Sequence, residues 1–295
     1  MRVVTLLPGA TEIVAALGGA GQLVGISHEC DHPWFVLHLP RVTSTPIETS
    51  LPGVAIDAEV RRLRDAGRAV IGVDADTLRR LAPDLLITQD LCEVCAVADG
   101  AVHRLAQAIH PAPAVLALTG RTLDGVMRDI LTVARALDLA GEGDELTAGL
   151  RSRLARLRRG AVAPGPRVLC VEWLEPLYLA GHWVPELVAA AGGVDAGAAP
   201  GQHSTVSSWT AAEALAPDLI VIMLCGFGLG RARAELDRLS DATALRTLRS
   251  APVWLLDGNA YTSRPGPRLV DGAERLQAAM AGAERSGLEP WCPHR

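Results

Sequence analysis

The sequence contains no lysine, so all 28 of its basic residues are arginines, and 33 acidic residues outnumber them. The arginines form no basic block or stripe, which argues against a nucleic-acid binder. The GxGxxG and P-loop signatures of nucleotide sites are missing, as is the GxSxG elbow of serine hydrolases. No apolar run reaches the roughly 18 residues that a membrane-spanning helix needs. These absences exclude the commonest sequence signatures of nucleotide, nucleic-acid and membrane chemistry.

The first residues, MRVVTLLPGATEIVAALGG, contain neither a basic leader with a long apolar region nor a small-residue cleavage site. They are typical of a strand, a turn and a helix. Six cysteines in 295 residues are unremarkable for a reducing compartment, where thiols stay free. We therefore expect a globular cytoplasmic protein without a membrane span.

An internal repeat is the most informative feature that is present. The segment EIVAALGG at 12–19 returns as ELVAAAGG at 186–193, and LAPDLLI at 81–87 returns as LAPDLIV at 215–221. Repetition at this scale indicates two similar lobes. Because ligands gather in the crevices of α/β folds, we expect a ligand site in the cleft between the lobes.

Strand and helix patterns alternate within each lobe, which predicts mostly parallel sheets. Residues 1–119 form the expected N-terminal lobe and residues 161–295 the C-terminal lobe, whose last strand we place at 253–256. Residues 120–160 show helical spacing and predict connecting helices, with Gly141 and Gly143 interrupting the helical run. A helical connector is stiffer than a Gly/Ser linker, so small hinge motion is expected.

Unusual side chains follow the predicted strands at their carboxyl ends, where open α/β sheets bind ligands. These clusters are HECDH at 28–32, the polar and thiol residues of 89–95, Trp173 with Glu175, the segment 225–227, and the segment 259–264. Apolar strands that end in polar, thiol and aromatic groups predict a small-molecule pocket.

The segment Cys92-Glu93-Val94-Cys95 is a CxxC motif, and His28 and Cys30 form a second cluster of soft ligands. Together these groups suit zinc, iron or another transition metal. A second CxxC, which a zinc ribbon requires, is missing. A redox dithiol and simple packing of small buried thiols are the other two interpretations.

Other candidates are aromatic, imidazole and guanidinium groups. His203 lies in the loop GQHSTVSSW, and we expect Trp173 and Trp183 to line a pocket, whereas Trp34, Trp254 and Trp291 are assigned to packing. The segment RPGPR, which starts at Arg264, displays two guanidinium groups that suit carboxylate or phosphate, or that pair with nearby acids.

Several motifs resemble the cobalamin-binding and iron-chelate-binding proteins, which are substrate-binding proteins of ABC importers. The motifs are LLPGATEIVAALG, VGISHECDHP, LAPDLLITQDLCEVCAV, EWLEPLYLAGHWVPELVAAAGG and DGNAYTSRPGPRLVDG. The resemblance implies a class III substrate-binding protein, with two Rossmann-like α/β lobes joined by a long backbone helix and the ligand between them. The groove residues that it implies are Pro8, Gly9, Ala10, His28, Glu29, Cys30, Gln89, Cys92, Trp173, Trp183, His203, Cys225, Phe227, Tyr261 and Arg264.

The resemblance also bears on partners. Family receptors dock to their permease through an acidic residue on each lobe, for which Glu48 or Glu59 and Glu186 are the candidates. Exported receptors carry a signal peptide or lipobox, whereas this sequence starts at its first predicted strand. We therefore expect a cytoplasmic member of the group. Without an export signal, a small-molecule ligand is the expected partner and a permease is the alternative.

Three functions remain open at this stage. The favoured one is a binding protein for a corrinoid such as cobalamin, or for another metal chelate. The second is a metal-dependent enzyme in which His28, Cys30, Cys92 and Cys95 bind zinc, iron or copper, and Glu29 or Glu93 acts as acid or base. The third is a sensor whose dithiol changes the angle between the lobes.

Overall fold

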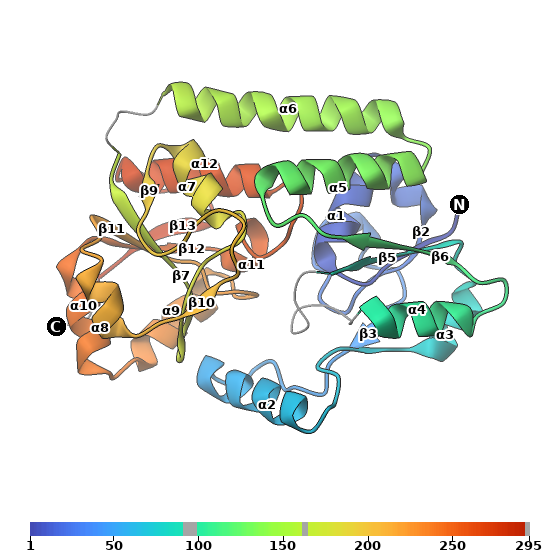
Figure 1. Ribbon diagram of the computed structural model, residues 1–295, viewed down its shortest axis with the longest axis horizontal. Coiled ribbons are helices and arrows are strands. Elements are labelled where there is room, and N and C mark those ends of the chain that lie inside the picture. The colour runs from blue at the N-terminus through green and yellow to red at the C-terminus, as the bar shows by residue number, and fades with distance from the viewer. Residues whose placement is uncertain (91–98, 161–164, 293–295) are drawn as a thin grey trace.

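Two α/β lobes lie side by side in the computed structural model, and the long helix α6 (Ala140–Arg159) runs across both of them (Figure 1). The structure describes residues 1–90, 99–160 and 165–292. The two-lobe architecture with parallel sheets and a helical connection is that of a class III substrate-binding protein, as the sequence predicts.

The N-terminal lobe is built on a four-stranded parallel sheet with the order β2-β1-β5-β6. Its strands are β1 (Val3–Thr5), β2 (Leu23–Gly25), β5 (Leu85–Gln89) and β6 (Ala114–Leu118), with a separate ribbon of β3 (Thr43–Ser44) and β4 (Gly72–Val73). Its helices are α1 (Pro8–Ala16), α2 (Gly53–Asp65), α3 (Ala75–Leu81) and α4 (Asp99–Gln107). All five residues of β5 are buried, so this strand lies at the centre of the lobe.

The C-terminal lobe has a mixed sheet with the order β10-β8-β7-β11-β12-β13, and β9 pairs with β7. Its strands are β7 (Arg167–Leu174), β8 (Leu177–Leu179), β9 (Val194–Asp195), β10 (Thr205–Val206), β11 (Leu219–Ile222), β12 (Val253–Leu256) and β13 (Leu288–Trp291). Its helices are α7 (Val184–Ala191), α8 (Trp209–Ala214), α9 (Leu229–Arg238), α10 (Ala242–Ser250), α11 (Gly258–Tyr261) and α12 (Leu269–Met280).

The prediction that the chain's last strand lies at 253–256 is wrong, because β13 pairs antiparallel with β12. The proline at position 290 hides this strand from a propensity argument, since proline cannot donate to a sheet ladder and is confined to edges. Proline is tolerated here because β13 lies at the end of the sheet.

The sequence repeat is reproduced in three dimensions. The parallel order β9-β7-β11-β12 in one lobe matches β2-β1-β5-β6 in the other. The N–H of Arg2 donates to the Asp84 carboxylate at 2.7 Å, and the N–H of Arg167 donates to Asp218 at 2.8 Å. Asp84 and Asp218, which are equivalent in the repeat, therefore accept hydrogen bonds from equivalent backbone amides of the two lobes.

The connection between the lobes consists of α5 (Leu123–Ala136) and α6. The prediction that Gly141 and Gly143 interrupt this connection is wrong, because α6 begins at Ala140 and runs through both glycines. A Cβ at Gly143 would lie only 2.5 Å from the Cβ of Ala134 on α5. Glycine at this position therefore permits a close helix crossing.

A single hydrophobic cluster runs through both lobes and the connector. It includes Ile13 of α1, Ile130 of α5, Leu154 of α6, Leu187 of α7 and Leu276 of α12. Burying these side chains removes apolar surface from water in both lobes at once. The cluster therefore couples the stability of the lobes.

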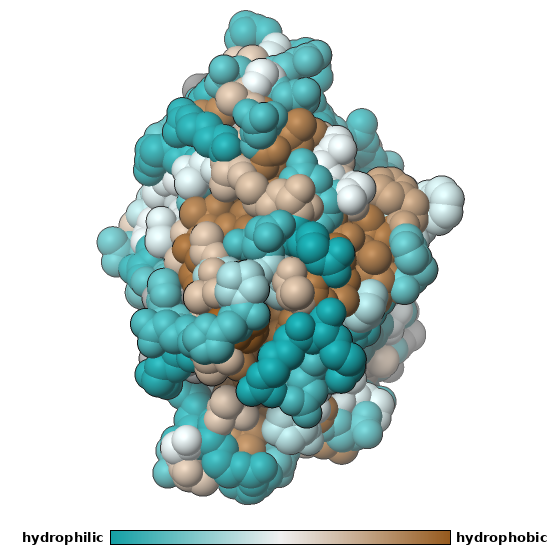
Figure 2. Space-filling model, turned by 90° about the vertical axis from the view of Figure 1, so that its right-hand side faces the viewer, coloured by the Kyte–Doolittle hydropathy of each residue, from teal (hydrophilic) through white to brown (hydrophobic). Residues whose placement is uncertain are grey.

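On the surface at the N-terminal-lobe end, hydrophobic residues alternate with hydrophilic ones (Figure 2).

The assignment of Trp34 to packing is wrong, since 80% of its surface is exposed and its ring contacts that of Phe35. Within the described residues, no helix has the length and hydrophobicity that a membrane crossing requires.

We predict a single cooperative unfolding transition, because the central cluster spans both lobes. Ile130→Ala should lower the free energy of unfolding by about 2–5 kcal/mol while keeping one transition. Urea unfolding followed by circular dichroism and by tryptophan fluorescence measures this. Val194→Ala, at a half-exposed position, is the control and should change stability by less than about 0.5 kcal/mol. Two transitions, one for each lobe, would contradict the coupling.

Candidate functional site

The first turn of α1 meets the RPGPR segment of the other lobe directly. Pro8, Gly9 and Ala10 are all buried, and a Cβ at Gly9 would lie 2.9 Å from the carbonyl oxygen of Pro265. Glycine therefore allows two backbones from different lobes to touch. Of these three predicted groove residues, Gly9 lies against the backbone of the opposite lobe, and its neighbours Pro8 and Ala10 are buried.

Arg264 is the central residue of this boundary, with only 7% of its surface exposed. Its guanidinium donates to Glu12 at 3.0 Å and to both carboxylate oxygens of Asp31, which come from the N-terminal lobe. It also donates to the Asn259 side chain at 2.7 Å and to the Glu29 carbonyl at 3.3 Å. The sequence predicts Arg264 as a ligand residue, whereas the structure uses its donors to join the lobes.

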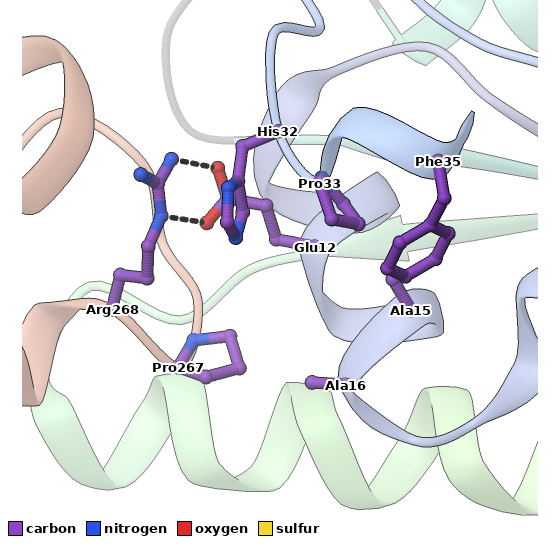
Figure 3. Close-up of a pocket in the computed structure, with 8 residues that line it drawn as sticks. All are labelled: Glu12, Ala15, Ala16, His32, Pro33, Phe35, Pro267 and Arg268. Atoms are coloured by element: carbon purple, nitrogen blue, oxygen red, sulfur yellow. Dashed lines mark hydrogen bonds and ion pairs between the residues drawn. The ribbon is translucent and has the colours of Figure 1, made fainter. Parts of the chain in front are cut away.

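A second guanidinium completes the network. Arg268 donates to both carboxylate oxygens of Glu12 in a two-point contact (Figure 3). Glu12 is only 4% exposed, so it is a buried carboxylate between two arginines. Two arginines and the carboxylates of Glu12 and Asp31 balance in charge; Glu12 and Arg264 are buried, whereas the Asp31 side chain is 52% exposed. We call these four residues the interlobe clamp.

A cavity of about 170 Å³ lies beside the clamp (Figure 3). It is lined by Glu12, Ala15, Ala16, His32, Pro33, Phe35, Pro267 and Arg268. Both carboxylate oxygens of Glu12 are already taken by Arg268. The cavity therefore has mostly apolar walls and an acid whose acceptors are occupied.

The charges of the clamp stabilise one another. Burial alone would raise the pKa of Asp31, but the hydrogen bonds and the positive charge of Arg264 outweigh it and lower this pKa. Burial would likewise lower the pKa of Arg264, but Asp31 and Glu12 raise it. Both groups therefore remain ionised near neutral pH.

An aromatic pair lies at a second point of the boundary. The rings of Trp173 and Phe227 are 5.1 Å apart, and the Arg231 guanidinium lies 3.9 Å from the centre of the Phe227 ring. Gly53 of the N-terminal lobe faces this pair, because a Cβ there would lie 3.3 Å from the Trp173 ring. The crevice between them encloses about 10 Å³, enough for about one water molecule.

Of the four predicted metal ligands, the structure describes His28 and Cys30, each of which contacts a threonine hydroxyl. Cys30 is buried and its sulfur lies 3.0 Å from the Thr11 hydroxyl, and burial raises the pKa of this thiol. The Nδ1 of His28 lies 2.6 Å from the Thr43 hydroxyl. The described residues contain no group of three His, Cys, Asp or Glu side chains that could hold a metal ion. Cys92 and Cys95 lie outside the described residues, as does Glu93.

The histidine and tryptophan candidates of the C-terminal lobe occupy different environments. His203 is exposed, and its ring lies 5.3 Å from that of His182. Trp183 is buried at 6% exposure, and its indole N–H donates to the Thr262 carbonyl at 2.8 Å. Trp183 therefore belongs to the core of its lobe, whereas the sequence predicts a pocket position.

Three further candidates are placed separately. Gln89 is buried at the end of β5. Tyr261 is held by Arg275, which stacks 3.6 Å from its ring centre and donates to its hydroxyl. Cys225 is half-buried and carries a free thiol. Tyr261 also lies next to the clamp, since the Arg268 guanidinium is 5.9 Å from the centre of its ring.

The predicted docking acids differ in the contacts that their carboxylates make. Glu48 is exposed and bonds to Ser50, and Glu59 pairs with Arg62 on the same helix. Glu186 instead accepts the N–H of Leu123 at 2.6 Å, at the start of the connector. Glu186 therefore stabilises the junction between the lobes.

The sequence indicated that the two guanidiniums of RPGPR could pair with acids, and it placed Asp31 in a candidate cluster, but it missed Glu12, Gly53 and Arg231 at the boundary. One signal was present, because Glu12 and Glu186 are the repeated acid of two otherwise apolar helices. In both lobes this glutamate makes a contact that leaves its own lobe. The glutamate that is repeated in two otherwise apolar helices therefore indicated residues at the boundary between the lobes.

Comparison with known proteins gives the family. The sequence pattern of the periplasmic binding protein family matches residues 3–254. The chain belongs to this family. No match was found among curated proteins.

Solved structures of similar fold support the same architecture. A periplasmic heme-binding protein from Pseudomonas aeruginosa is 22% identical, with a TM-score of 0.76 over 100% of this chain and 99% of that one. The vitamin B12-binding protein BtuF of Vibrio cholerae is 21% identical, with a TM-score of 0.64 over 95% and 96%. An Fe3+-hydroxamate transport protein from Saccharomonospora viridis is 19% identical, with a TM-score of 0.62 over 96% and 93%.

We predict that Glu12→Gln lowers the free energy of unfolding by about 3 kcal/mol, because it leaves the buried Arg264 and the half-buried Arg268 with one carboxylate. Urea unfolding measures the change. Glu213→Gln is the control, since Glu213 pairs with Arg246 at the surface and should cost less than about 1 kcal/mol. An equal effect of the two substitutions would show that the clamp is not a buried network.

We predict that stability falls as the pH drops below about 6.5. Burial, with the charge of Arg41, lowers the pKa of His28; burial, with His203 and Arg121, lowers that of His182. Below pH about 6.5 the unfolded chain therefore binds protons that the folded chain does not, which favours unfolding. Urea midpoints at about pH 7.5 and 5.5 test this, and His182→Gln should weaken the dependence. A His182→Gln variant whose midpoint changes between these pH values as much as that of the wild type would refute the assignment.

Proposed function

We propose that this protein binds a corrinoid or another metal chelate, such as heme or a ferric hydroxamate, in the groove between its lobes. The observation that carries the proposal is the aromatic pair Trp173 and Phe227, which lies where the two lobes face each other. Flat, partly apolar ligands gain stacking energy on aromatic faces. The ligands named for the similar structures, heme, vitamin B12 and Fe3+-hydroxamate, are all metal chelates, and the first two contain a flat macrocycle.

The position of the pair in the fold agrees with this use. Trp173 lies near the carboxyl end of β7, and Phe227 follows the carboxyl end of β11. These two strands are parallel neighbours, so their ends lie at the same edge of the sheet. The groove edge therefore offers an aromatic surface, as a small-molecule site does.

The crevice must widen before it can hold such a ligand. Its volume of about 10 Å³ is far below the roughly 300–1,000 Å³ of typical ligand pockets. The opposing wall is formed by Gly53 and Val54. Movement of this wall away from the aromatic pair gives the needed space.

A metal-dependent enzyme receives no comparable support, since the Cys30 thiol bonds with Thr11 inside the N-terminal lobe. A permease partner and a cytoplasmic location stay predictions. The accessible acids Glu48 and Glu59 remain the candidates for permease docking on the N-terminal lobe.

We predict that the purified protein binds at least one of cobalamin, heme and a ferric hydroxamate, as measured by absorption titration. Trp173→Ala should raise the Kd at least tenfold, because it removes the larger ring of the pair. Trp34→Ala is the matched control at an exposed tryptophan and should leave the Kd unchanged. Failure of the wild type to bind any of the three at micromolar concentrations would overturn the proposal.

A further inference from the structure

A segment of the N-terminal lobe crosses the groove and lies on the C-terminal lobe. The carbonyl groups of Thr49 and Leu51 accept hydrogen bonds from the Arg231 guanidinium. The N–H of Gly53 donates to the Glu235 carboxylate at 2.9 Å. We call residues 49–56 the strap.

The strap is anchored beside the aromatic pair. Arg231 and Glu235 both belong to α9, and Arg231 also stacks on the Phe227 ring. The Glu235 side chain is only 10% exposed, so its bond to Gly53 is largely shielded from water. One helix of the C-terminal lobe therefore holds the strap over the rings.

Glycine at position 53 brings the strap close to Trp173. A Cβ at this position would lie 3.3 Å from both the Trp173 ring and the Glu235 carboxylate. Any side chain would have to displace one of these groups. The strap backbone thus occupies the space directly against the ring that the proposed function gives to the ligand.

The strap is held less firmly by its own lobe than by these contacts. Val54 is 52% exposed, and Ile56 is only half-buried and packs against the cores of both lobes. On α2, the first fully packed hydrophobic side chain is Leu63, more than one turn beyond the strap. Segments with few buried apolar contacts open at low cost in free energy.

We propose that the strap is an autoinhibitory element that covers Trp173 and Phe227 in the ligand-free protein and competes with the ligand for them. This inference rests on the proposed function of the same groove. The ligand binds only the fraction of molecules whose strap is displaced. The apparent Kd therefore equals the intrinsic Kd divided by that fraction. Loosening the strap should therefore tighten binding.

The test is Arg231→Ala, titrated with the chelate that the wild type binds. The apparent Kd should fall about tenfold, since hydrogen bonds from a charged donor to the strap are lost. Arg233→Ala is the matched control on the same helix, because Arg233 pairs with Glu289 and should leave the Kd at the wild-type value. Glu235→Gln, which retains the side-chain shape, should shift the Kd in the same direction as Arg231→Ala. An unchanged or weaker affinity in both strap variants overturns the proposal.

A readout that needs no ligand separates this proposal from the proposed function. Hydrogen exchange of the Gly53 amide should be faster in ligand-free Arg231→Ala than in the wild type or Arg233→Ala. In the wild type, adding the bound chelate should also speed this exchange. Slower exchange on adding the chelate would mean that the strap closes over the ligand, which overturns the competition. If no chelate binds, the proposed function fails, whereas the ligand-free comparison still decides whether Arg231 holds the strap.

Discussion

The structure depends on a guanidinium that is buried where the two lobes meet. Arg264 is only 7% exposed and takes its two carboxylate partners, Glu12 and Asp31, from the other lobe. Separating the lobes widely would break these charge-assisted hydrogen bonds and expose part of the hydrophobic cluster that both lobes share. The clamp and the helical connector therefore hold the lobes close together. In this account, a ligand binds at the edge of the groove after the strap moves, and the lobes rotate little relative to each other.

The internal duplication explains why both lobes contribute to their boundary in similar ways. The repeated helix carries Glu12 in one lobe and Glu186 in the other. Glu12 bonds with arginines of the C-terminal lobe, while Glu186 bonds with the start of α5. An acid in an apolar helix has no place in a dry core without a partner. The duplication thus placed two acids at the junction, where each has a partner outside its own lobe.

The sequence predicted what depends on local pattern and missed what depends on how the lobes meet. Alternating apolar runs predicted the two α/β lobes, and helical spacing over 120–160 predicted the connection that α5 and α6 form. The pairing of Glu12 with Arg264 joins residues from opposite ends of the chain, so no local spacing encodes it. Tryptophan patterns could not distinguish exposed Trp34 from buried Trp183, because each follows a histidine within two residues. The strap was missed because its only local mark is a Pro52-Gly53 turn, which predicts a helix start and not the surface it contacts.

Small-angle X-ray scattering of the ligand-free protein, compared with Arg264→Met, tests the central claim most directly. If the clamp holds the lobes together, the wild type scatters as the compact arrangement of the structure, and the variant shows a larger radius of gyration with its secondary structure intact. A ligand-free wild type that is already expanded, with no further change in the variant, would contradict the account.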